Sequence, residues 1–234
     1  MNSMHQGFWD AWELIITFDR DLYEIVFLSL KVTVSAVILA SLIALPLGAF
    51  LAVFRFKFRR YVIAVLNALM GLPPVVVGLF VYMLLSRAGP LGGFGLLFSP
   101  SAMIIAQVII IVPLIASISH QAIRDLWSEY HDLLISMNAT RFQRAKALLW
   151  DGKRALLTAI LAGFGRAIGE VGAIMIVGGN IEHATRVLTT AIALETGKGN
   201  FAFAMGLGLV LITLAILINL LIHIVGKTER ASTW

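Results

Sequence analysis

Long runs of apolar residues dominate the pattern along this 234-residue chain. About 20 consecutive apolar residues are needed for a helix to cross roughly 30 Å of hydrocarbon, and five runs are long enough. They cover residues 25–54, 61–86, 101–119, 155–181 and 199–222. The pattern therefore predicts an all-α membrane protein with about five transmembrane helices.

Composition agrees with lipid as the solvent of this protein. Hydrophobic residues make up 59% of the chain, charged residues only 13%, and the mean hydropathy is +0.92. A water-soluble globule of this size needs more polar surface. The net charge of +5 does not indicate nucleic acid as a partner, because apolar runs separate the basic residues. With no cysteine in the chain, disulfides and thiolate chemistry are excluded.

The distribution of lysine and arginine predicts how the helices are oriented. Twelve of the 18 basic residues lie in residues 55–60, 120–154 and 227–230. Loops rich in lysine and arginine stay in the cytoplasm. We therefore expect the N-terminus outside, the C-terminus inside, and one membrane domain over residues 1–234.

The first 24 residues lack the basic start of a cleavable signal. Phe8, Trp12, Ile15 and Ile16 would share one face of a helix. Residues 1–24 are therefore interpreted as an external interfacial segment, either a short amphipathic helix or a simple aromatic anchor.

The predicted cytoplasmic segment at residues 120–154 is too long for a turn. Apolar residues recur in it at spacings of three and four, which is typical of an amphipathic helix; these are Ile123, Trp127, Tyr130, Leu134 and Met137. Asn138 interrupts the pattern and tolerates a left-handed backbone. A second helix is expected near Thr140. Together they form either a knob that a soluble partner grips or a segment resting on lipid headgroups.

Two ionisable residues, Arg166 and Glu170, interrupt the fourth apolar run. They stand four residues apart, so on a continuous helix they would share a face and pair. The pair either fixes the helix to a neighbour or belongs to a gate. Gly165 and Gly169 have the G-x-x-x-G spacing that lets two helices approach closely. Proline at positions 73, 74 and 113 predicts kinks in the second and third runs.

A predicted external loop offers hydroxyl, amide and guanidinium donors suited to an oxyanion. These donors are Asn180, Thr185, Arg186, Thr189 and Thr190. The same residues could contact a partner protein or simply be solvated. No G-x-x-x-x-G-K-[ST] motif exists for ATP. The five histidines show no metal-ligand spacing, so no metal site is predicted.

Residues 132–151 resemble the EAA loop of ABC importer permeases, through Asp132, Leu133, Leu134 and Asn138. Asn138 stands where that family has glycine, and Asp151 where it has proline. The run GFGRAIGEVGAIMIVGGNI at residues 163–181 resembles the signature of molybdate and tungstate permeases. The runs at 184–199 (similar to the tungstate branch) and 71–79 extend this resemblance over most of the chain.

The resemblance implies a type I ABC importer permease fold (MetI-like) in a prokaryotic plasma membrane. It implies a second copy of the chain, two cytoplasmic ATPase subunits and an external solute-binding protein as partners. The EAA-like loop would dock the ATPases, through Asp132, Leu133, Leu134, Asn138, Ala139, Arg141 and Arg144. Arg166, Glu170, Gly165 and Gly169 would belong to the path or gate.

The function that the resemblance implies is ATP-driven uptake of an oxyanion, with tungstate favoured. A molybdate permease is the alternative, and a secondary transporter or channel is more remote. We expect no catalysis by this chain and no cofactor bound to it, with ATP and Mg²⁺ on the partner ATPase.

Overall fold

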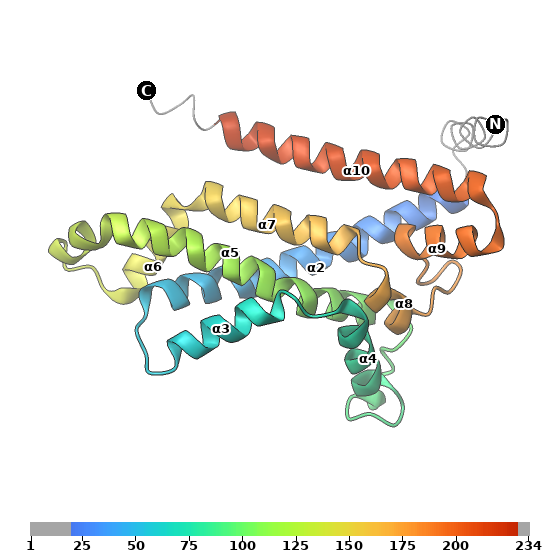
Figure 1. Cartoon of the computed structure of the whole chain (residues 1–234), viewed down its shortest axis with the longest axis horizontal. Coiled ribbons are helices and arrows are strands. Elements are labelled where there is room, and N and C mark those ends of the chain that lie inside the picture. The colour runs from blue at the N-terminus through green and yellow to red at the C-terminus, as the bar shows by residue number, and fades with distance from the viewer. Residues whose placement is uncertain (1–19, 229–234) are drawn as a thin grey trace. The chain divides into compact units, whose positions relative to one another are not determined.

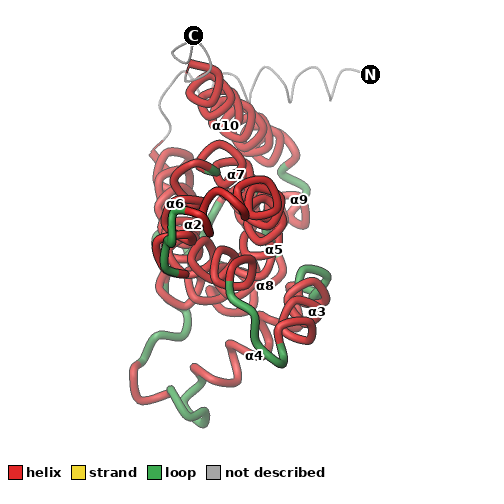
Figure 2. The backbone as a smooth tube through the Cα atoms, turned by 90° about the vertical axis from the view of Figure 1, so that its left-hand side faces the viewer, coloured by secondary structure: helices red, strands yellow, loops and turns green. Residues whose placement is uncertain are grey.

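The computed structural model describes residues 20–228, and their side chains as far as residue 220. Figure 2 shows only helices and loops over these residues, which confirms the all-α prediction. The helices, labelled in Figure 1, are α2 (Arg20–Val53), α3 (Arg59–Leu69), α4 (Pro74–Leu85), α5 (Pro100–Ser136), α6 (Arg141–Asp151), α7 (Lys153–Ile168), α8 (Gly172–Gly178), α9 (Leu188–Lys198) and α10 (Phe201–Thr228), with a 3-10 turn at Gly92–Phe94. The predicted interfacial segment lies outside the described residues, except for residues 20–24, which begin α2.

Three helices in the described part of the chain are long and apolar enough to cross a membrane: α2, α5 and residues 201–220 of α10. Two further pairs, α3 with α4 and α7 with α8, meet the same test when each pair is one span with a short break. These five elements coincide with the five apolar runs of the sequence. The orientation inferred from lysine and arginine stays a prediction.

The proline residues have different effects in the two runs that contain them. Pro73 is the N-cap residue of α4 and Pro74 its first residue, so the second span breaks there as predicted. Proline is favoured at a first helical position because the amide that it lacks would have no intrahelical acceptor. Pro113, in contrast, lies inside α5, which continues to Ser136.

The length of α5 explains how the third span becomes the predicted cytoplasmic knob. Its 37 residues correspond to about 55 Å, which exceeds the roughly 30 Å of hydrocarbon in a bilayer. The amphipathic stretch from residue 120 is therefore the end of α5 and not a separate short helix. The second predicted helix does exist, as α6.

The chain divides into two compact units. Among the described residues, the first consists of residues 20–36, 73–107 and 168–221, and the second of residues 37–72, 108–167 and 222–228. In the first unit, Leu22 and Ile25 of α2 pack in one core with Leu188 and Ala191 of α9 and Leu207 of α10. The prediction of a single permease domain remains a prediction.

The core of the second unit joins four helices. It contains buried residues of α2 (Ala49, Ala52, Val53), α5 (Ile123), α6 (Leu148) and α7 (Leu156). Arg59, at the start of α3, donates from its guanidinium to the carbonyl oxygens of Leu51 and Ala52. This side chain therefore satisfies carbonyls in the last turn of α2, which have no partner within their own helix.

In the first unit, α4 and α8 lie side by side because Gly78 has no side chain (Figure 1). A Cβ atom on Gly78 would lie 2.7 Å from the Cα atom of Ala173. Backbone cannot yield as a flexible side chain does, so even one methyl group would push the helices apart.

We expect Gly78→Ala to lower the free energy of unfolding by about 1–3 kcal/mol, the usual cost of overpacking. The melting temperature of the purified protein in detergent measures the effect. Gly93→Ala is the matched control, because a Cβ atom there meets nothing within 4 Å. Equal melting temperatures for the two variants would contradict the close contact between α4 and α8.

Candidate functional site

The EAA-like loop turns sharply between α5 and α6. Asn138 adopts φ +50°, the left-handed conformation that the sequence predicted for it. Its amide donates to the carbonyl of Ile135 at 2.8 Å, and the amide of Ala139 donates to that of Leu134 at 3.2 Å. The turn thereby satisfies carbonyls at the end of α5 that would otherwise lack partners.

A capping box begins α6. The amide of Gln143 donates to the Thr140 hydroxyl at 3.3 Å, and the amide of Thr140 donates to the Gln143 side-chain oxygen at 2.7 Å. Arg144 then fastens α6 to α5. Its Nε donates to the carbonyl of Ala139 at 2.7 Å, and its guanidinium carbon lies 5.7 Å from the centre of the Trp127 ring.

The loop has an inner face and an exposed face. Leu134 packs against the core of the second unit. Leu133, Met137 and Phe142 are exposed by 56%, 70% and 76%. Asp132 and Arg141 are also exposed. Oδ1 of Asp132 lies 2.9 Å from Nδ1 of His131. The exposed face therefore combines apolar and charged groups.

Two details of this loop differ from the sequence interpretation. The sequence pattern predicts Met137 on the apolar face of a helix, but α5 ends at Ser136, so Met137 lies in the turn and is exposed. Phe142 was not predicted as a site residue. The one sequence signal for Phe142 is that it follows Thr140, where the second helix is expected to begin.

The break between α7 and α8 changes the geometry expected for Arg166 and Glu170. Because α7 ends at Ile168, Arg166 lies in its last turn and Glu170 lies beyond it. The two residues do not share the face of one continuous helix, so that part of the prediction is wrong. Sequence spacing missed the break because Gly169 is compatible with both a helix and its end.

Glu170 stabilises the start of α8. Its side chain is buried, and Oε1 accepts a hydrogen bond from the amide of Ala173 at 3.2 Å. The carbonyl oxygen of Glu170 accepts a second bond, from the hydroxyl of Thr189 in α9 at 2.8 Å. The break is therefore tied to both α8 and α9.

The glycines of this region also differ from the G-x-x-x-G expectation. A Cβ atom on Gly165 would meet nothing within 4 Å, and Gly169 is exposed in the break. Gly163 is the closely packed glycine of α7, because a Cβ atom there would lie 2.5 Å from Cδ1 of Ile115. The assignment of Gly165 and Gly169 to the path or gate stays a prediction.

Three of the predicted oxyanion donors use their hydroxyls for the backbone. Thr185 donates to the carbonyl of Gly178 at 2.6 Å and accepts from the amide of Ile181 at 2.9 Å. Thr190 forms bonds of 3.1 Å with both the amide and the carbonyl of Val187. With Thr189 bound to Glu170, all three hydroxyls shape the loop between α8 and α9.

The remaining two predicted donors, Asn180 and Arg186, are only partly hydrogen-bonded. Asn180, at φ +50°, donates weakly to the carbonyl of Thr190 at 3.5 Å. Arg186 pairs with Glu182 at 2.7 Å. Within the described part of the chain, Oδ1 of Asn180 and Nε of Arg186 are buried without a hydrogen-bond partner.

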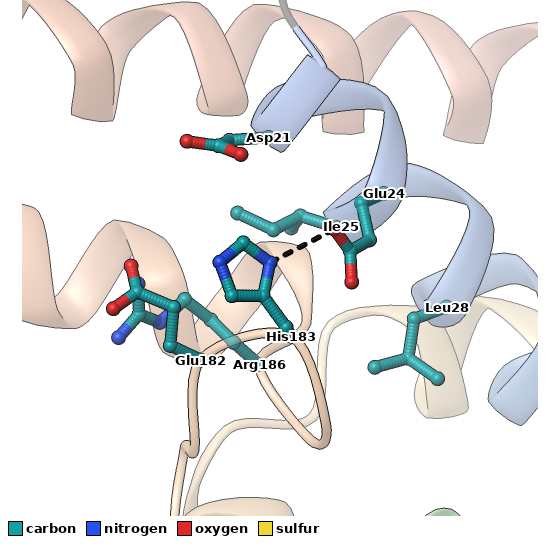
Figure 3. Close-up of a pocket in the computed structure, with 7 residues that line it drawn as sticks. All are labelled: Asp21, Glu24, Ile25, Leu28, Glu182, His183 and Arg186. Carbon is teal, nitrogen blue, oxygen red and sulfur yellow. Dashed lines mark hydrogen bonds and ion pairs between the residues drawn. The ribbon is translucent and has the colours of Figure 1, made fainter.

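Figure 3 shows a small pocket beside this loop, where His183 meets the start of α2. Nδ1 of His183 lies 2.9 Å from Oε2 of Glu24. That hydrogen bond, followed by attraction to the same carboxylate, raises the pKa of His183 above its ordinary value. Ligand atoms of Asp21, Glu24 and His183 lie within 4.8 Å of one another, an arrangement that can hold a metal ion. Sequence spacing could not reveal it, because 159 residues separate Glu24 from His183.

These features define a multi-pass membrane protein with a folded, partly exposed loop between α5 and α6. Residues 44–228 match the family described as the binding-protein-dependent transport system inner membrane component, and the chain belongs to this family. It is thus a transport component with several spans in the inner membrane.

Relatives and solved structures agree with this family. The chain is 40% identical over 223 residues to the tungstate uptake system permease protein TupB of Peptoclostridium acidaminophilum, covering 95% of this chain and 98% of that protein. It is 35% identical to TupB of Campylobacter jejuni, covering 97% and 95%. An inward-facing structure of the MetNI methionine ABC transporter has the same fold, with a TM-score of 0.68 at 20% identity over 95% of this chain and 99% of that one.

Removing the cap of α6 tests how the loop is held. We expect Thr140→Ala to destabilise α6 by about 1 kcal/mol, because the amide of Gln143 loses its acceptor. Hydrogen exchange of the α6 amides should rise roughly fivefold. Thr158→Ala is the control, since its hydroxyl makes only a long 3.4 Å bond within α7. Unchanged exchange in α6 would mean that the capping box does not hold the helix.

The pair of His183 and Glu24 should give a pH-dependent stability. Because the folded pKa of His183 is raised, its contribution is complete below the ordinary pKa of about 6.5 and is lost as pH rises through the folded value. We expect the melting temperature of the wild type, relative to Glu24→Gln, to fall over that window.

The control for this titration is Asp125→Asn, which removes an exposed carboxylate that is not among the groups raising the pKa of His183. Its offset from the wild type should be constant with pH. Parallel curves for the wild type and Glu24→Gln would show that the pair contributes nothing to the fold.

Proposed function

We propose that this chain is the permease subunit of an ATP-driven tungstate importer. The observation that carries the proposal is the identity of 35–40%, over nearly the full length of each chain, with two tungstate uptake permeases. The run at residues 163–181, which resembles the signature of oxyanion permeases, supports the same cargo class. A molybdate permease is the alternative.

In this proposal the chain pairs with a second copy, two cytoplasmic ATPase subunits bind ATP and Mg²⁺, and an external binding protein captures the anion. The chain itself performs no hydrolysis. The family description, which names a binding-protein-dependent system, and the fold shared with an ABC transporter support this assembly.

The EAA-like loop is the proposed contact with the ATPase. Its exposed apolar residues, Leu133, Met137 and Phe142, offer area that binding would bury. Asp132 and Arg141 add charge to this exposed face, and Arg144 holds α6 against Trp127. Burial of apolar side chains inside a polar rim is the usual anatomy of a protein interface.

The packing of the second unit would transmit a movement of α6 to the neighbouring helices. Leu148 of α6 is buried against Ile123 of α5, Leu156 of α7 and the end of α2. Protein cores are close-packed and deform little, so a push on α6 must displace these helices with it. The loop therefore transmits a displacement to these helices as a rigid element and not as a flexible segment.

The region around Arg166 and Glu170 is the proposed path or gate. A pore must bind its cargo weakly enough to release it. Arg166, in the last turn of α7, and Arg186, in the loop between α8 and α9, are the proposed sources of attraction for the anion. Asn180 and Arg186, with their unsatisfied buried atoms, are the proposed external contacts for the oxyanion or the binding protein.

The assembly is tested by copurifying the chain with its ATPase in lipid nanodiscs and adding the binding protein. We expect ATP hydrolysis to rise when the binding protein carries tungstate, and the affinity of that protein for tungstate, molybdate and sulfate to identify the cargo. Uptake that persists without the ATPase would instead indicate a secondary transporter.

A single substitution tests the loop. Phe142→Asp places a charge in the proposed apolar contact, so we expect at least a tenfold loss of ATPase copurification without a change in melting temperature. Phe94→Asp is the matched control, because Phe94 is 72% exposed on the predicted opposite side. Retention of the ATPase by Phe142→Asp would remove this residue from the interface.

A further inference from the structure

An open groove of about 590 Å³ lies in the second unit, between α2 on one side and the end of α6 with the start of α7 on the other. All but two of its lining residues are apolar, the exceptions being Ser41 and Lys153. The α2 wall is formed by Val37, Ile38, Ser41, Leu42, Leu45 and Pro46. The opposite wall is formed by Leu149, Lys153, Leu156, Leu157 and Ile160. Helical spacing places the α2 residues in one strip and the four α7 residues in another, whereas Leu149 belongs to the end of α6.

Aromatic and basic side chains mark the depth of this groove in the membrane. Trp150 is exposed just before α7, and Nζ of Lys153 lies 5.8 Å from its ring centre. Tryptophan is enriched at the boundary between lipid and water, and lysine reaches the same level. The Lys153 end therefore lies among headgroups, and the rest of the groove extends into hydrocarbon.

The chemistry of the groove selects one kind of occupant. Lys153 is followed by Arg154, and both belong to the side predicted to be cytoplasmic, where anionic lipids attract basic groups. An apolar helix offers no counterpart for the ammonium group of Lys153 at the end of the groove, whereas the phosphate of an anionic lipid does.

We propose that this groove binds an anionic phospholipid of the cytoplasmic leaflet, with an acyl chain between α2 and α7 and the phosphate at Lys153. The lipid would contact Leu156, which belongs to the core that holds α6, and Leu45 and Leu149, which pack against that core. Occupancy would thus stiffen the connection between the loop and the spans.

Native mass spectrometry of the delipidated full-length protein, incubated with equal phosphatidylglycerol and phosphatidylcholine, measures this binding. We expect at least a threefold preference for phosphatidylglycerol, reduced to near equality by Lys153→Ala. Lys57→Ala is the matched control, because it removes the same charge from another loop on the predicted cytoplasmic side. Leu157→Trp should fill the groove and reduce binding of both lipids, whereas Val65→Trp on α3 should not.

An undiminished preference in Lys153→Ala, or unchanged binding in Leu157→Trp, would overturn the proposal. A rival occupant is a second copy of the chain. Since the chain has no cysteine, Leu42→Cys is a single probe in membranes. Efficient cross-linking between two copies at this position would also overturn it. A protein that takes up tungstate but shows no lipid preference would contradict the lipid site and leave the proposed transport function intact. The two proposals can therefore fail separately.

Discussion

The structure depends on one constraint: inside a bilayer, each backbone polar group must find its partner within the protein. Continuous helices meet this demand by themselves, but α3 with α4 and α7 with α8 do not run unbroken. At the second break, Oε1 of Glu170 accepts from the amide of Ala173, and Thr189 donates to the carbonyl of Glu170. The carboxylate of Glu170, although it lies in an apolar run, thus gives a backbone amide at the start of α8 its hydrogen-bond acceptor.

The same demand explains the loops at the ends of the helices. Arg59 satisfies carbonyls at the end of α2, Thr185 satisfies the carbonyl of Gly178 at the end of α8, and Thr140 satisfies an amide at the start of α6. Side chains that resemble a row of ligand donors in the sequence serve here as caps. The oxyanion contacts proposed for this chain accordingly narrow to Asn180 and Arg186.

Sequence predicted the elements that local chemistry determines. Apolar run length predicted the three long helices and the two broken pairs, Pro73 and Pro74 predicted the break before α4, and Asn138 predicted the turn into α6. The break after Ile168 could not be predicted, because it is stabilised by Thr189, a residue 19 positions away from Glu170. The pocket of His183 and the groove beside Lys153 were equally invisible, because each is formed by segments far apart in the chain.

The rigidity of the short helix after Asn138 has a thermodynamic consequence. Capping box, left-handed turn and the Arg144 clamp give α6 its shape before any partner arrives. A disordered segment must lose conformational entropy when it binds, and this loss subtracts from affinity. A preformed α6 avoids that loss, so any partner that bound this loop would meet the same surface each time.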